Sequence, residues 1–208
     1  MSDVIVLSKV RIAFPHIKEP QVSKEGRSMY NAVFLVAPDD AGCTQFMQKV
    51  GEISLAKWKE KTPDVMSIIN ADAKKRCYAD GNTKINQTTF KVYDGYAGKV
   101  VISANNKNAP QLFDANGKQV DPNNTMVYKG EAGKIYGGCY VNAVLKPWVQ
   151  QNDHGVGIRC DLVAIQFAAD GESFGGSVEP DVSGVFGAVA APAAPVAAPA
   201  GLPAFMMS

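Results

Sequence analysis

The segment from Tyr136 to Trp148 has the clearest alternation of apolar and polar residues in the chain. Successive side chains of a β-strand point to opposite faces of the sheet, so this segment predicts a strand with one face in a core. The inner set is Gly137, Cys139, Val141, Ala143, Leu145 and Pro147, and the outer set is Tyr136, Tyr140, Asn142, Lys146 and Trp148. The outer set suits the stacking of unpaired bases, and it also suits packing against a helix or a partner subunit.

Alternation elsewhere predicts further strands. The first expected strand has Val10, Ile12 and Phe14 on one face and Lys9, Arg11 and Ala13 on the other. It ends before Pro15 and is followed by a polar loop over residues 16–27. The second is apolar on both faces and is therefore expected at the centre of a sheet. Turns are expected at residues 114–117 and 151–155. The predicted strands besides the one above are Val4–Phe14, Ser28–Ala37, Gly98–Asn105 and Val156–Phe167.

Only one helix has a readable pattern. The turn at residues 38–40 supplies an N-cap, and the helix should run to about Lys61, where Thr62 and Pro63 stop it. Its apolar stripe is Cys43, Phe46, Met47, Val50, Ile53 and Trp58. Residues 64–95 show no clean period, so no element is predicted there.

Because the strands do not alternate with helices, the pattern favours a mainly β protein over a parallel, doubly wound sheet. A β-barrel of the OB-fold type with one or two inserted α-helices fits residues 1–180. After Gly184 the chain becomes rich in Ala and Pro, which predicts a disordered tail over residues 181–208.

The tail ends in an apolar tip formed by Leu202, Phe205, Met206 and Met207. A tethered apolar tip suits burial in a partner's groove, and it equally suits an ordinary chain end with a few chance hydrophobic residues. No acidic residue follows Asp181, so a partner would have to bind the tip by apolar burial rather than by charge.

Composition narrows the function. The chain has 208 residues and a net charge of +1, so a nucleic-acid site would be a local patch rather than a general basic character. The four cysteines and two histidines have no ligand spacing, which predicts no metal site and no cofactor. Reduced cysteines, no secretory signal and no long apolar segment predict a cytoplasmic protein without a membrane partner.

Catalysis is not expected. Both histidines, His16 and His154, fall in predicted loops, so neither is held as a general base. The chain has neither a Gly-x-Ser-x-Gly nucleophile motif nor a phosphate-binding loop of the Walker type. We therefore predict a binding protein rather than an enzyme.

Several short motifs resemble a family of bacteriophage single-stranded DNA-binding proteins. They begin with Lys-Val-Arg-Ile-Ala-Phe-Pro-His at 9–16 and Tyr-Asn-Ala-Val-Phe-Leu-Val at 30–36. They continue with Asp-Gly-Tyr-Ala-Gly at 94–98 and Tyr-Gly-Gly-Cys-Tyr-Val-Asn-Ala at 136–143. The resemblance extends from about residue 5 to residue 176. It implies an OB fold, sequence-independent binding of single-stranded DNA, a role in phage replication, recombination or repair, and a homodimer.

The candidate DNA contacts follow from the predicted faces. Tyr140 and Trp148, then Tyr136 and Tyr96, are the stacking candidates, because every base has a π-face. The candidate contacts to phosphates or base edges are Lys99, Lys107, Lys146, Arg159, Arg11, Asn105 and Asn142. The alternative function is a structural or assembly β-protein of a virion, in which the same aromatic residues form a subunit interface. Replication or recombination proteins are possible partners of the tail.

Overall fold

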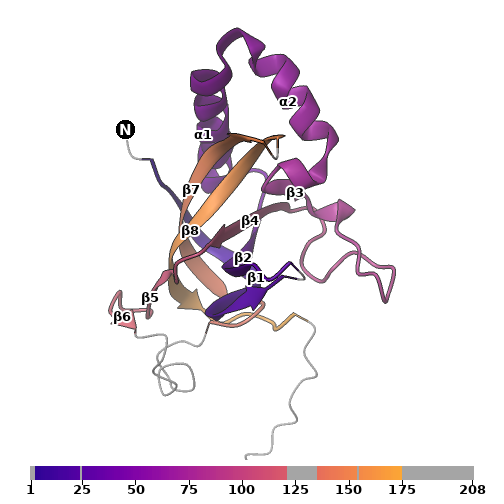
Figure 1. Ribbon diagram of the computed structural model, residues 1–208. Helices are drawn as coiled ribbons and strands as arrows, with labels where there is room; N and C mark the ends of the chain where they lie inside the picture. Colours follow the sequence, from indigo (N-terminus) through magenta and orange to yellow (C-terminus); the bar gives the residue numbers. More distant parts are fainter. Residues whose placement is uncertain (1–2, 24, 121–134, 154, 175–208) are drawn as a thin grey trace, which may run out of the picture. The chain divides into compact units, whose positions relative to one another are not determined.

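The computed structural model describes residues 3–23, 25–120, 135–153 and 155–174 (Figure 1). The predicted tail, with Leu202, Phe205, Met206 and Met207 at its tip, lies outside the described residues. The fold is built from eight strands and two α-helices joined by short 3-10 turns within the described part. The strands are β1 (Ile5–Val22), β2 (Ser28–Val36), β3 (Tyr78–Asp80), β4 (Val100–Asn106), β5 (Gln111–Phe113), β6 (Gln119–Val120), β7 (Tyr140–Asn152) and β8 (Gly155–Ala169).

Five of these strands close into a barrel. Strands β4, β2, β1, β7 and β8 are neighbours in that order, and each of these neighbouring pairs is antiparallel. The barrel closes where β4 meets β8 in a parallel contact between Asn105 and Asp161. The amide of Asn106 donates to the carbonyl of Leu162 at 3.1 Å beside that contact. This closed barrel confirms the predicted OB fold.

Strand β1 is longer than predicted. Pro15 does not end it, and most of the expected loop over 16–27 is strand as far as Val22. Two irregularities in its pairing coincide with residues of positive φ, Lys9 at 50° and Phe14 at 46°. Such bulges let a long strand bend around a barrel while keeping its partners on both sides. The second bulge turns Phe14 outward, which corrects its expected place on the inner face with Val10 and Ile12.

The β7–β8 hairpin agrees closely with the alternation. Val141, Ala143 and Leu145 are fully buried, whereas Lys146 and Trp148 of the opposite face are exposed. The strand begins at Tyr140 rather than at Tyr136, because residues 136–139 form a turn closed by the Cys139 amide donating to the Tyr136 carbonyl. The predicted turn at residues 114–117 is also present, between β5 and β6.

Two helices lie between β2 and β4. Helix α1 (Ala41–Trp58) is the predicted one, and Asp40 caps it by accepting from the Gly42 amide. Thr62 and Pro63 do not end the helical region but start a second helix, α2 (Thr62–Ala71). Proline is tolerated in the first turn of a helix, where its missing N–H would have no partner. This helix was missed because its pattern is short. Figure 1 shows both helices on one side of the barrel.

The buried residues form two clusters. The larger fills the barrel and includes Phe34, Ile102 and Leu145, with Phe46 of α1 packed against it. The smaller lies outside the barrel wall, where Ala13, Leu35 and Val101 are covered by Tyr96. Most of the covering segment, residues 81–98, belongs to the stretch 64–95 in which no element was predicted. It holds its shape through local hydrogen bonds, such as the Asn86 carboxamide accepting from the Thr88 amide.

Two further features bear on function. No helix among the described residues is long and apolar enough to cross a membrane. The four cysteines are buried free thiols, as expected for Cys139 on the inner face. Burial raises the pKa of the Cys139 thiol, so it stays protonated and packs as a small apolar side chain.

Candidate nucleic-acid interface

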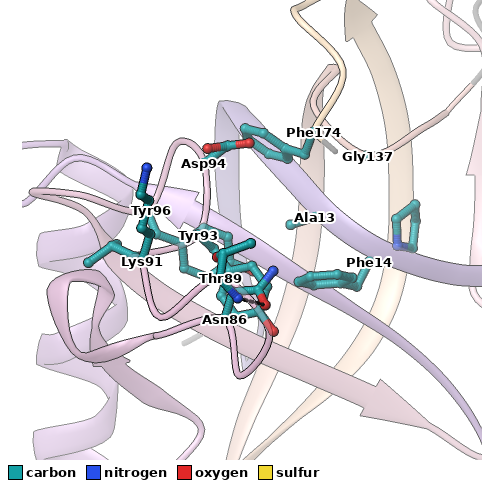
Figure 2. A pocket seen from close by; sticks show the side chains of 12 residues that line it. Ala13, Phe14, Asn86, Thr89, Lys91, Tyr93, Asp94, Tyr96, Gly137 and Phe174 are labelled. Carbon is teal, nitrogen blue, oxygen red and sulfur yellow. Dashed lines mark hydrogen bonds between the residues drawn. The ribbon is translucent and has the colours of Figure 1, made fainter. Parts of the chain in front are cut away.

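A hollow of about 640 Å³ lies between β1 and the segment that covers the smaller cluster. Phe14 and Pro15 of β1 line one side, and Tyr93 faces Phe14 from the other (Figure 2). The rings of Phe14 and Tyr93 meet edge to face, with centroids 5.5 Å apart. Phe174 and Gly137 line the end where the chain returns from β8. We call this hollow the aromatic pocket.

Two phenylalanines beside this pocket have unusual exposure and backbone. Phe14 is 51% exposed and Phe90 is 81% exposed, although both side chains are large and apolar. Both residues also have positive φ, 46° and 54°. A bulky residue rarely adopts this conformation, and such strain concentrates at functional sites. Water-exposed rings on strained backbone at one pocket are therefore a reason to look for a ligand that covers them.

A second hollow continues the surface across β2 and β4. Ala13 of the aromatic pocket pairs with Val33, which pairs in turn with Ser103 of β4. Val33 and Ser103 line a hollow of about 530 Å³, and two of the predicted contacts, Asn105 and Lys107, lie on its rim. We call the two hollows together the groove. The remaining polar lining residues of the groove include Arg27, Asn31, Asn86, Lys91 and Asp94.

Trp148 and Lys146 lie elsewhere. Together with Lys49, Ile53 and Lys57 of α1 they line a separate hollow of about 380 Å³, which shares no residue with the groove. The Trp148 ring is 39% exposed, and its indole N–H donates to the Asp161 carboxylate at 2.8 Å. Lys146 is exposed and stands opposite Asp161 in the strand register. These residues are thus accessible, but they form a surface of their own.

Three of the predicted contact residues interact instead with the segment that follows β8 or with one another. The Arg11 guanidinium donates to the carbonyls of Gly138, at 3.0 Å, and of Glu172. It also lies over the rings of Tyr140 and Phe174, at 5.9 Å and 4.0 Å from their centroids. The Tyr136 hydroxyl accepts from the Gly171 amide at 3.0 Å and lies 2.8 Å from its carbonyl. Arg11, Tyr136 and Tyr140 therefore already have partners within the chain.

The remaining predicted DNA contacts lie at separate places on the protein. Tyr96 is only 4% exposed, so it cannot present an open ring, and burial raises the pKa of its hydroxyl to about 12. Arg159 donates to the Gln150 side chain and to the Lys74 carbonyl. Asn142 bridges the Lys9 amide and Gln166. Lys99 is half-buried and lines another hollow with Arg76. The structure thus brings Asn105, Lys107 and the largely buried Tyr96 to the groove and places the other predicted residues elsewhere.

Comparison with known proteins gives the family. Residues 3–190 match the model of a family described as Enterobacter phage Enc34, ssDNA-binding protein. The chain belongs to this family. A relative from Acyrthosiphon pisum secondary endosymbiont phage 1, described as putative protein p50, is 33% identical over 177 residues, which are 83% of this chain and 86% of the relative.

Solved structures of phage proteins share the fold of this Enc34-family member. The single-stranded DNA-binding protein of bacteriophage Enc34, in complex with ssDNA, superposes with a TM-score of 0.64 at 24% identity, over 83% of this chain and 90% of that one. The single-stranded DNA-binding protein gp2.5 of bacteriophage T7 gives a TM-score of 0.50 at 12% identity, over 90% and 98%. The barrel is thus a fold found in phage single-stranded DNA-binding proteins.

Sequence reasoning missed the aromatic side of the groove in this family member. Phe14 fits the inward set of a regular strand, and only the bulge that precedes His16 reverses it. Phe90 and Tyr93 lie in a segment held by turns, which leave no period to read. One signal was present in the sequence, because Gly95 and Gly98 flank Tyr96 and glycine is typical of tight turns. In the structure both glycines have positive φ.

Among the described residues, no cluster of acidic, His and Cys side chains could hold a metal ion.

Proposed function

We propose that this protein binds single-stranded DNA without regard to sequence and acts in phage DNA replication, recombination or repair. Membership of the Enc34 family supports the ligand class. The single observation that supports the location is the groove on the outer face of β1, β2 and β4, where exposed rings stand beside lysines. OB folds bind oligonucleotides across the face of their second and third barrel strands, which are β2 and β4 here.

Base stacking supplies the sequence-independent part of the binding. Every base presents a π-face, so a ring that stacks on it contributes about 1–3 kcal/mol whichever base is present. Phe14 and Tyr93 offer rings inside the aromatic pocket, and Phe90 offers one that protrudes beside it. Because Phe90 makes few contacts in the free protein, a base that covers it removes apolar surface from water at little cost.

Phosphates are bound by cations on the rim of the groove. Lys91 and Lys107 are exposed, and no ion pair is recorded for either within the described residues. Arg27 is also on the rim, with an exposed partner, Glu25, at 3.4 Å. An exposed pair of this kind is weak and can exchange its carboxylate for a phosphate. Asn105 contributes an amide that donates to a phosphate or to a base edge.

The wider assignments are part of the same proposal. Residues 1–180 form the DNA-binding domain and residues 181–208 a flexible tether, and the protein acts as a dimer in the host cytoplasm. The tip with Leu202, Phe205, Met206 and Met207 binds replication or recombination proteins by apolar burial. Binding involves no catalytic step. Deletion of residues 188–208 tests the tether, because unchanged binding of every partner would reject it.

A titration tests the main function. A labelled oligo-dT strand, the matching duplex and an RNA strand are titrated with the full chain at several salt concentrations, with fluorescence anisotropy as the signal. We expect tight binding of oligo-dT that weakens steeply with salt, since each neutralised phosphate contributes about −0.7 to the log–log slope for single strands. No binding at low salt, or a response that is flat with salt, would contradict the proposal. Such a result would restore the assembly-protein alternative.

A further inference from the structure

The chain segment that follows β8 forms one wall of the aromatic pocket. Residues 170–174, which we call the strap, cross back over the start of β7 after β8 has ended. The strap ends at Phe174, whose amide donates to the Gly137 carbonyl at 2.9 Å and whose ring lines the pocket. Figure 2 shows the Phe174 ring at the end of the pocket that Gly137 also lines. A ring of the aromatic pocket is thus supplied by a segment outside the barrel strands.

Arg11 is the side chain that ties this strap to the barrel. Its guanidinium donates to the Glu172 carbonyl of the strap and to the Gly138 carbonyl of the turn before β7. The Cζ atom of the guanidinium also lies over the Phe174 ring, 4.0 Å from its centroid. A guanidinium offers five donors in a planar fork and stacks on aromatic rings, whereas an ammonium offers neither geometry. Arg11 therefore fixes both the backbone of the strap and the position of its ring.

Three glycines, two beside the strap and one within it, allow the strap to pack closely against its neighbours. A Cβ at Gly95 would lie 2.4 Å from the Phe174 ring, and Gly95 also has a φ of +77°. A Cβ at Gly138 would lie 2.1 Å from the Glu172 carbonyl oxygen, and one at Gly171 would lie 2.4 Å from the Gly138 oxygen. Such distances are far inside van der Waals contact, so the packed position of the strap depends on these glycines. The strap is thus a fitted part of the pocket wall.

We propose that Arg11 is a positioning residue for DNA binding, and that it acts by holding Phe174 as a stacking wall of the aromatic pocket. This differs from the sequence-based expectation that Arg11 contacts a phosphate. Both donor edges recorded for its guanidinium point to backbone carbonyls, and one face is covered by a ring. The inference rests on the proposed function, because it assigns a role within the same groove.

The two roles differ in what they recognise on the DNA. A phosphate contact is made to the backbone and persists when the bases are removed. A stacking wall acts only on a base. An oligomer of abasic deoxyribose units with the same number of phosphates as oligo-dT therefore separates them. The full chain is compared with its Arg11→Lys, Arg11→Met and Phe174→Leu variants on both oligomers, with Lys107→Met as the matched phosphate control.

We expect Arg11→Lys and Phe174→Leu each to weaken oligo-dT binding by about tenfold, within the range of one lost stacking contact. Their affinity for the abasic oligomer and the salt slope should equal those of the wild-type chain. Combining the two substitutions should cost no more than the larger single effect, because both remove the same wall. Lys107→Met should weaken both oligomers and reduce the salt slope by about 0.7.

Other results would overturn the inference. Wild-type affinity in Arg11→Lys, with Arg11→Met weakening both oligomers equally and flattening the salt slope, would make Arg11 a phosphate contact. If the Arg11 variants fail to fold, Phe174→Leu alone decides, and an equal loss on both oligomers or no loss overturns the proposal. A wild-type chain that binds neither oligomer overturns the proposed function together with this inference. A wild-type chain that binds normally, beside variants that match it, overturns the inference alone.

Discussion

The outer face of β7 and the groove on β1, β2 and β4 are both polar surfaces with aromatic rings, but they differ in how those rings are used. On β7, Trp148 donates to Asp161 and Tyr140 lies against Arg11, so each has a partner within the chain. At the groove, Phe14 lines the aromatic pocket and Phe90 lies between two of its lining residues, Thr89 and Lys91. Both phenylalanines stand in water on strained backbone. Exposure of an aromatic ring is common, whereas exposure of a large apolar ring on strained backbone indicates a ligand.

The comparison also explains why alternation pointed to the outer face of β7 and not to the groove. Alternation reports which side of a strand is away from the core. On β7 it correctly separated the buried residues, among them Leu145, from the outward ones. It says nothing of which outward groups are already bound by neighbours. The stacking role of Trp148 stays a prediction, and the experiments below compare it with the groove.

The largest expected effect concerns the inner face of β7. Leu145→Ala should lower the free energy of unfolding by about 2–5 kcal/mol, because it opens a cavity in the barrel. Val144→Ala, on the neighbouring outward position, is the matched control and should cost well under half as much. Urea denaturation followed by circular dichroism measures both. Equal losses would mean that the two faces of β7 are not distinguished in the way the structure shows.

The next effect separates the two surfaces by affinity. Phe14→Ala should weaken oligo-dT binding by about 1–3 kcal/mol, the contribution of one stacked base. Phe90→Ala should act in the same direction without loss of stability, since its side chain is 81% exposed. Trp148→Ala is the control on the other surface, and we expect little change there. Anisotropy titrations at one salt concentration compare the three, and a dominant effect at Trp148 would favour β7 as the site.

Tyr96 supports the groove from beneath and provides a test by pH. Burial raises the pKa of its hydroxyl from the usual value near 10 to about 12 in the folded protein. The folded state therefore holds this proton more tightly than the unfolded state, so its contribution is complete below pH 10 and is lost as pH rises toward 12. Stability should fall by roughly 2 kcal/mol across this window.

The Tyr96→Phe variant isolates that contribution. It removes the ionisable hydroxyl and keeps the ring over Ala13, Leu35 and Val101. Thermal unfolding measured from pH 9 to pH 12 should therefore be less pH-dependent in the variant than in the wild-type chain. An identical pH profile in both would show that the Tyr96 hydroxyl is not buried, and that the segment over the smaller cluster is not packed as described.

The smallest effect concerns single cations. Lys107→Met and Lys146→Met remove one positive charge each, from the groove and from the β7 surface. We expect the salt slope of oligo-dT binding to become shallower by about 0.7 for Lys107→Met and to be unchanged for Lys146→Met. The reverse result would place the phosphates along β7.

Much of the barrel could be predicted, because its signals are local. The inner residues of β7, the cap at Asp40 and the turn at residues 114–117 each follow from a short pattern. The continuation of β1 past Pro15 could not be predicted, since it depends on Gln21 and Val22 pairing with β2. Helix α2 was missed because a proline usually marks the end of a helix, whereas Pro63 lies in the first turn of one.

The site was harder to predict than the fold. Asn105 and Lys107 of the groove were candidates because they lie at the end of a clear strand, in which Asn105 faces outward. Phe14 was assigned to the wrong face, since one bulge reverses the alternation behind it. Arg11 has the residue type of a phosphate ligand, but the turn before β7 and the strap after β8 give its guanidinium other partners. Contacts made by distant parts of the chain decide these cases, and no local pattern records them.

Hydrogen exchange with and without bound oligo-dT tests the central claim most directly, because it reports on both surfaces in one experiment on the unmodified chain. The account predicts slower exchange on DNA binding at residues 13–16, 86–96 and 103–107, which border the groove. Exchange at residues 144–149 and along α1 should change little. Protection confined to residues 144–149 and α1, with the groove unaffected, would contradict the account and return the site to the outer face of β7.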